Sequence, residues 1–213
     1  LRSYWNARNI QFEKWYDLLT LFNNLEQENM ESVIANDPRA IYDLALRMLT
    51  SNPITHKIST DGMEKPEIVD TSYIERYINS QWLRIEHNHR RMGRQSWLRE
   101  LVGFILATGW YSVFVYATQY NLIAEVWNPA NVFPEFGVDG LSKCVHIYKL
   151  SPSEANRKAR VTEWSIPRPF NTEVTLYNYF YMDDYGKPVN AIVMGNVLVK
   201  PPTQFAPTEQ NAG

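Results

Sequence analysis

The stretch LVGFILATGWYSVFVYATQYNLIAEVW, residues 101–127, decides the fold because the spacing of its apolar residues changes within a few positions. Up to Thr108 they recur three or four residues apart, as on one face of a helix. Gly109 is a typical helix C-terminus. Two runs rich in β-branched and aromatic residues follow, with a polar turn over residues 118–121 between them. The stretch therefore predicts a buried helix that ends at Gly109 and is followed by a β-hairpin.

Helical patterns precede this stretch. They cover residues 3–27, 37–52 and 70–109, with an interruption at Gly93 and an exposed polar loop over residues 53–70. In the second helix, the predicted core face consists of Ile41, Leu44, Ala45, Met48 and Leu49.

Strand patterns follow the stretch. They cover residues 143–150, 173–182, 191–194 and 197–200, and the last two flank a Gly195-Asn196 turn. Ser151-Pro-Ser-Glu154 is a capping box that opens a short helix to about Ala159. The proline-containing segments at 128–129 and 133–134 predict a loop.

Helices first and strands later favour an α+β fold: an N-terminal helical layer followed by a mainly antiparallel β-rich part with short helices. The expected division is a helical part over residues 1–109, a β-rich part over 110–200 and a loose tail over 201–213.

The composition is that of a globular protein, since 45% of the 213 residues are hydrophobic and 21% are charged. The net charge of -2 means that nucleic acid could bind only through a local basic patch. Cys144 is the one cysteine, so no disulfide can form within the chain and a reducing, intracellular environment is expected. We recognise no membrane span or signal peptide, and because the sequence does not begin with Met, we expect part of a longer protein.

Tyr181-Met-Asp-Asp184 is the feature closest to a catalytic motif. Reverse transcriptases carry this tetrapeptide on a β-hairpin, where paired aspartates hold Mg²⁺. Two-metal chemistry also needs a carboxylate from another strand, and residues 104–117, where it would be expected, contain no Asp or Glu. We therefore predict a solvated turn over Met182–Pro188. A polymerase-like nucleic-acid enzyme built on Asp183 and Asp184 is the alternative.

The histidines predict no metal site. His87 and His89 are two positions apart on a helix, so their side chains point about 200° from each other and cannot share a metal. Both are expected on the polar face of the helix, and His56 and His146 are isolated in the sequence.

A basic cluster lies in the third predicted helical segment. It consists of Arg84, Arg90, Arg91, Arg94 and Arg99. These side chains could contact the phosphates of DNA. The slightly negative net charge favours the other interpretation, a solvated helix face or salt bridges to Glu86 and Glu100 of neighbouring copies.

No phosphate-binding loop, dinucleotide fingerprint, zincin helix, nucleophile elbow or paired-cysteine motif is present in the sequence. We therefore predict no catalytic, cofactor-binding or metal-binding residues. The sequence favours a structural and binding component over an enzyme.

Several segments occur in an order that resembles one known family. They are residues 36–39, 49–53, 101–116, 122–134, 137–141, 146–148 and 151–155, together with the arginine-bearing helix. The strongest is LIAEVWNPANVFP, residues 122–134. This pattern, over roughly residues 36–200, resembles the wing region of the portal proteins of tailed double-stranded DNA bacteriophages.

The resemblance implies a ring of about twelve subunits at one capsid vertex, through which double-stranded DNA passes non-specifically. It also implies contacts with the terminase large subunit during packaging, and with head-completion, adaptor and capsid proteins. The virion would be assembled in the host cytoplasm, and the packaging ATPase would belong to the terminase. Portals also have a stem, a clip and often a crown, so the chain is expected to be a fragment. Another minor head protein with the same α+β pattern is a further alternative.

Overall fold

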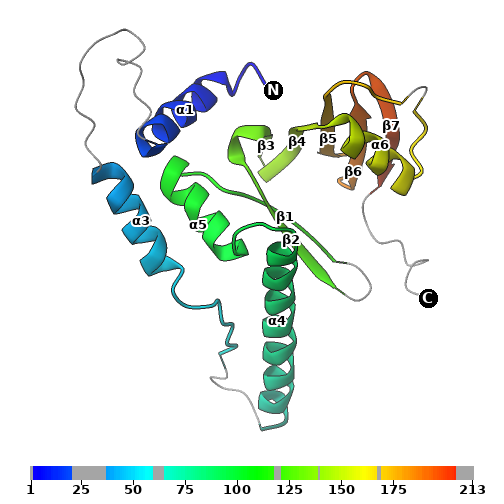
Figure 1. The fold of residues 1–213 in the computed structure, drawn as a ribbon. Helices are drawn as coiled ribbons and strands as arrows, with labels where there is room; N and C mark the ends of the chain where they lie inside the picture. Colours follow the sequence, from blue (N-terminus) through cyan, green and yellow to red (C-terminus); the bar gives the residue numbers. More distant parts are fainter. Residues whose placement is uncertain are drawn as a thin grey trace. The chain divides into compact units, whose positions relative to one another are not determined.

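The computed structural model describes residues 2–20, 37–59, 65–117, 121–138, 140–166 and 169–204. Helices come first along the chain and antiparallel sheets follow, so the fold is α+β as predicted (Figure 1). Two compact units are formed: a helical unit, Arg8–Asn128, and a sheet unit, Leu1–Ala7 with Pro129–Gly213. The β-hairpin after Gly109 belongs to the helical unit, so the units divide after residue 128 and not at residue 109.

The helical unit contains four helices and a two-stranded sheet among the described residues. They are α1 (Asn6–Thr20, whose first two residues fall in the sheet unit), α3 (Asp37–Leu49), α4 (Lys65–Arg91), α5 (Trp97–Thr108), β1 (Ser112–Ala117) and β2 (Leu122–Trp127). Strands β1 and β2 pair antiparallel, which confirms the predicted hairpin. The core of the helical unit joins Ile85 of α4 and Trp97 of α5 to Ala124 and Val126 of β2.

Both ends of α5 are capped, the N-terminus by Ser96 and the C-terminus by Gly109. The Ser96 hydroxyl accepts a hydrogen bond from the Arg99 backbone N–H at the N-terminus. Gly109 ends the helix in the left-handed conformation, with φ 68°, and its N–H donates to the Ile105 carbonyl. The break predicted at Gly93 is also present, because α4 ends at Arg91 and Gly93 has φ 72°.

Helix α4 starts at Lys65, so the predicted loop over residues 53–70 was wrong in its second part. Pro66 lies in the first turn of α4, where a helix needs no backbone N–H donor and tolerates proline. Residues 53–59 form no helix or strand and are bound to α4 by its side chains. The backbone N–H of His56 donates to Asn79 Oδ1 at 2.9 Å, and that of Ile58 donates to Glu75 Oε1 at 2.6 Å.

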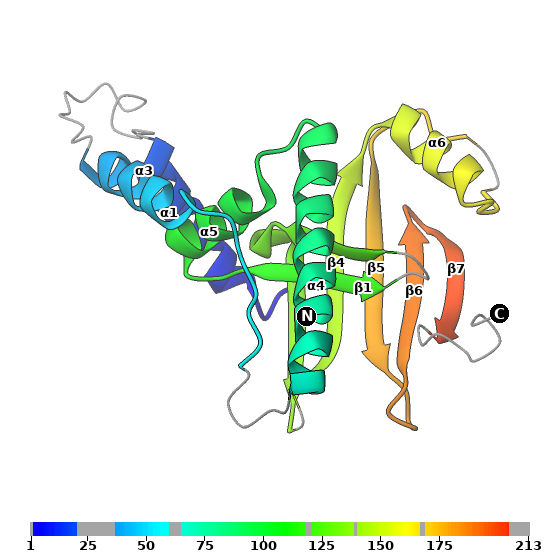
Figure 2. The same cartoon turned by 90° about the horizontal axis from the view of Figure 1, so that it is seen from below.

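The sheet unit is an antiparallel meander in the order β3-β4-β5-β6-β7. Its elements are η1 (Pro129–Asn131), β3 (Val132–Gly137), β4 (Gly140–Leu150), α6 (Pro152–Val161), β5 (Val174–Met182), β6 (Pro188–Met194) and β7 (Val197–Gln204). Helix α6 lies against the sheet (Figure 2). Its Ala155 belongs to a core that includes Leu176 and Met194. The predicted strands, the capping box at Ser151 and the Gly195-Asn196 turn are confirmed.

Two strand segments at the edges of this sheet were not predicted, because they contain prolines. Residues 132–137 form β3 and not the predicted loop, although Pro134 has no N–H to donate. An edge strand tolerates this loss, and the Pro134 carbonyl accepts a hydrogen bond from Trp5 Nε1 at 2.8 Å. Pro201 and Pro202 likewise lie in the edge strand β7, so the predicted loose tail was wrong for residues 201–204. The remaining tail, the end of the first predicted helix and Asp139 lie outside the described residues.

Among the residues that the structure describes, no helix combines the length and the hydrophobicity that a membrane crossing requires.

Leu176 tests the core of the sheet unit. Its side chain is 0% exposed between β4 and β6, so Leu176→Ala should lower the free energy of unfolding by about 2–5 kcal/mol. The control is Leu198→Ala on β7, where the side chain is largely exposed and the change should cost less than about 1 kcal/mol. Urea unfolding curves measure both values, and equal losses would contradict this assignment of the core.

Candidate functional site

The arginines predicted to form one basic cluster have separate roles. Arg94 is built into the helical unit: its Nη2 donates to Glu100 Oε1 at 2.6 Å and to the Val126 carbonyl at 2.8 Å. Arg90 lies 3.0 Å from Glu86 on the preceding turn of α4. Glu86 and Glu100, which were expected to bind arginines of neighbouring copies, therefore pair inside the chain.

The other three arginines differ in their surroundings. The guanidinium of Arg84 donates a hydrogen bond to the side chain of Asn121, which precedes β2. Arg99 is half-buried on α5. Arg91 is exposed and lines a hollow of about 400 Å³ beside β2. The five side chains thus carry less free positive charge than their number suggests.

His89 is buried, although it was predicted to lie on the polar face of the helix. Its exposed fraction is 2%, and its Nδ1 lies 3.5 Å from Glu100 Oε2. Burial is the main cause that lowers the pKa of His89, and the charge of Arg94 lowers it further. The expectation failed because the chain turns at Gly93 and brings α5 back against this turn of α4. His87, two residues earlier, is exposed, so the two histidines do point apart.

A protonation test follows from the burial of His89. The unfolded chain takes up its proton near pH 6.5, above the lowered folded pKa, so stability should fall as the pH drops below about 6.5. The loss is at most about 1.4 kcal/mol per pH unit for one histidine, until the folded state is protonated as well. Glu100 and Glu86 oppose the shift and Arg94 reinforces it.

Urea unfolding at several pH values measures this effect. His89→Gln should reduce the slope of unfolding free energy against pH between about pH 5 and 6.5, whereas the exposed control His87→Gln should leave it unchanged. The slope should not vanish, because burial also lowers the pKa of His146 in the sheet unit to about 4. Equal slopes in wild type and His89→Gln would contradict the account.

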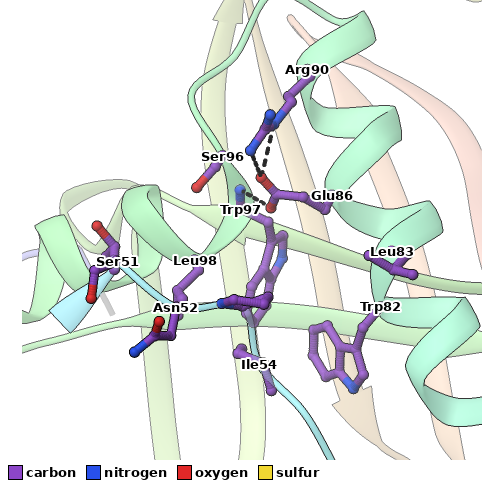
Figure 3. A pocket seen from close by; sticks show the side chains of 12 residues that line it. Ser51, Asn52, Ile54, Trp82, Leu83, Glu86, Arg90, Ser96, Trp97 and Leu98 are labelled. Atoms are coloured by element: carbon purple, nitrogen blue, oxygen red, sulfur yellow. Dashed lines mark hydrogen bonds and ion pairs between the residues drawn. The ribbon is translucent and has the colours of Figure 1, made fainter. Parts of the chain in front are cut away.

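A pocket of about 230 Å³ lies between the end of α3, helix α4 and the start of α5 (Figure 3). Its apolar lining includes Trp82 and Trp97, whose ring centroids are 4.8 Å apart. Glu86 accepts hydrogen bonds from the Trp97 backbone N–H at 2.8 Å and from Arg90 (Figure 3). The two charged residues of the lining therefore bind each other and the backbone. This pocket can accept an apolar group, and its two charged residues are not free for acid–base chemistry.

Asp183 has a structural role in the turn between β5 and β6. Its Oδ1 accepts backbone hydrogen bonds from Tyr185 at 2.9 Å and from Lys187 at 2.8 Å. The Lys187 hydrogen bond is the largest cause that lowers the pKa of Asp183. Asp184 is exposed, and the predicted solvated turn is confirmed. In the described part of the chain, no group of three or more His, Cys, Asp or Glu residues could hold a metal ion.

The two aspartates can be distinguished by mutation. Asp183→Asn should lower the melting temperature, because a neutral amide accepts the two turn hydrogen bonds less strongly than a carboxylate does. Asp184→Asn is the matched control and should leave the melting temperature unchanged. A polymerase-like metal site predicts a different result: Mg²⁺ would stabilise the wild type, and either substitution would abolish that stabilisation.

Helix α3 presents most of its predicted core face to solvent, and of that face only Ala45 is half-buried. Ile41, Leu44, Met48 and Leu49, the α3 stripe, have exposed fractions between 59% and 69%. The neighbouring face is the one that packs: Leu46 is buried, and Tyr42 Oη lies 3.4 Å from the Gly103 carbonyl on α5. The helix has two apolar faces, and the prediction chose the longer one. The i, i+4 spacing of Tyr42 and Leu46 was the signal for the true core face.

Comparison with models of known protein families finds no match for this chain, and comparison with curated proteins finds none either.

Proposed function

We propose that this chain is a structural subunit of a phage head portal ring, which forms the DNA entry and exit channel at one capsid vertex. The α3 stripe is the observation that carries the proposal. Four large apolar side chains that project from one helix are costly to leave in water, and such patches typically mark surfaces that another protein covers. A subunit of a closed ring has such a surface covered by its neighbours.

The described charged groups also favour a structural role. Glu86 binds the N-terminus of α5, Glu100 binds Arg94, and Asp183 closes a turn. Carboxylates held in this way stabilise the fold and are not free for acid–base chemistry. The segment order described above, which resembles a portal wing, gives this structural role its specific form.

In this role the ring would guide double-stranded DNA without reading its sequence. A net charge of -2 suits a channel that must not retain DNA by electrostatic attraction. The ring would be a platform for the terminase large subunit during packaging and for head-completion, adaptor and capsid proteins afterwards. Its location would be the virion.

Ring formation by the full-length protein tests the proposal. Native mass spectrometry and negative-stain electron microscopy should show closed rings with one subunit number, about twelve, and a central channel wide enough for duplex DNA. A full-length protein that remains monomeric at every concentration would exclude the portal role. Closed rings without such a channel would instead favour another head protein.

A further inference from the structure

The pocket of about 230 Å³ in the helical unit has aromatic walls, because Trp82 of α4 and Trp97 of α5 both line it (Figure 3). The two ring centroids lie 4.8 Å apart, and the ring planes meet at 59°. Ile54, from the segment after α3, adds an aliphatic side chain to the lining. We call this site the tryptophan pocket. Binding sites for small molecules are typically concave and lined mainly by apolar and aromatic side chains, as this pocket is.

Hydrogen bonds and ring stacking hold the walls of the tryptophan pocket in place. The His56 backbone N–H donates to Asn79 Oδ1 at 2.9 Å, and Asn79 Nδ2 donates to the His56 carbonyl at 3.3 Å, so the segment after α3 is tied to α4. The His56 ring stacks on Trp82, with centroids 5.5 Å apart and an angle of 5° between the planes. Trp97 is 5% exposed, and its backbone N–H donates to Glu86. Because the walls are already ordered, binding costs little conformational entropy.

The charges of the lining favour a neutral ligand. Among the described residues that line the pocket, only Glu86 and Arg90 are charged, and Glu86 Oε1 lies 3.0 Å from Arg90 Nη2. The other carboxylate oxygen of Glu86 accepts from the Trp97 backbone N–H at 2.8 Å. A charged ligand would lose its water shell without gaining a free counter-charge.

The volume and the walls of the pocket together define the ligand class. In another protein, an apolar cavity of about 150 Å³ binds one benzene ring. The tryptophan pocket is larger, at about 230 Å³, and has room for two fused rings. Aromatic rings pack on one another edge to face or offset face to face, and a saturated ring of the same size cannot make these contacts.

We propose that the tryptophan pocket binds a small neutral aromatic molecule of one or two fused rings. The rings of Trp82 and Trp97 would hold the molecule, and Ile54 and Leu98 would cover more of its surface. The inference goes beyond the portal role and does not depend on it, because the whole pocket lies in the helical unit of one chain.

The probe for this site is 5-fluoroindole, which is neutral, has two fused rings and gives one ¹⁹F NMR signal. With the 213-residue chain, this signal should shift and broaden with a Kd of about 1 mM or tighter, as expected for a ligand of about ten non-hydrogen atoms. The control 5-fluoroindole-2-carboxylate carries a negative charge on the same two rings and should bind at least about tenfold more weakly. Indole should displace the probe, whereas cyclohexanol at the same concentration should not.

The tryptophan signals locate the bound probe. The chain has 7 tryptophans, and each gives one indole N–H signal in a ¹⁵N–¹H NMR spectrum. The signals of Trp82 and Trp97, assigned with the variants Trp82→Phe and Trp97→Phe, should shift more on titration than those of the other tryptophans.

Ile54→Asp tests the pocket by mutation. Ile54 is 37% exposed, so the fold should be retained, while the new carboxylate places an unpaired charge in the lining and should raise the Kd of the probe at least about tenfold. The matched control is Ile74→Asp on α4, where the side chain is 45% exposed and outside the lining, and it should bind as wild type does. Circular dichroism verifies folding. Leu83→Asp, at a more exposed position of the lining, replaces Ile54→Asp if that variant does not fold.

Four results would overturn the inference. They are an unchanged ¹⁹F signal with the probe at up to about 5 mM, shifts confined to the other tryptophans, a folded Ile54→Asp or Leu83→Asp chain that binds as tightly as wild type, and tighter binding of the carboxylate than of 5-fluoroindole. The last result would show that Arg90 is free to bind an anion.

Discussion

Arg94 and Glu100 connect several elements of the helical unit. Arg94 leaves the turn after α4 and binds both the first turn of α5 and the Val126 carbonyl of β2, so one guanidinium joins three elements. The pair closes over His89 and stands beside the apolar core of Trp97 and Val126. The two side chains are half-buried, with 34% of Arg94 and 22% of Glu100 exposed. The start of α5 is held in addition by the Ser96 cap and by Glu86, which accepts a hydrogen bond from the Trp97 backbone N–H.

The packing of α3 determines which of its surfaces remains exposed. Tyr42 contacts α5 and Leu46 is buried, and the α3 stripe on the neighbouring face is left in solvent. The sheet unit builds its own core around Leu176 and Met194. The α3 stripe is one of several groups of large apolar side chains that the described residues leave exposed, and it is the one on which the proposed ring role rests.

Local signals in the sequence predicted where helices and strands begin and end, but they did not predict which side chains these elements bury or bind. The end of α5 at Gly109, the hairpin after it and the capping box at Ser151 follow from backbone conformation and capping, which depend on neighbouring residues. Strand β3 was missed because an edge position, which permits Pro134, is a property of the whole sheet. The burial of His89 and the pairing of Arg94 depend on how the chain returns after Gly93. The arginines could be located from the sequence, but their partners could not.

The mass of the assembled full-length protein tests the central claim, that this chain is a structural subunit of a closed ring, most directly. Native mass spectrometry should give one assembly mass that is about twelve times the mass of the subunit. A full-length protein that gives only the mass of the single subunit at every concentration would contradict the account.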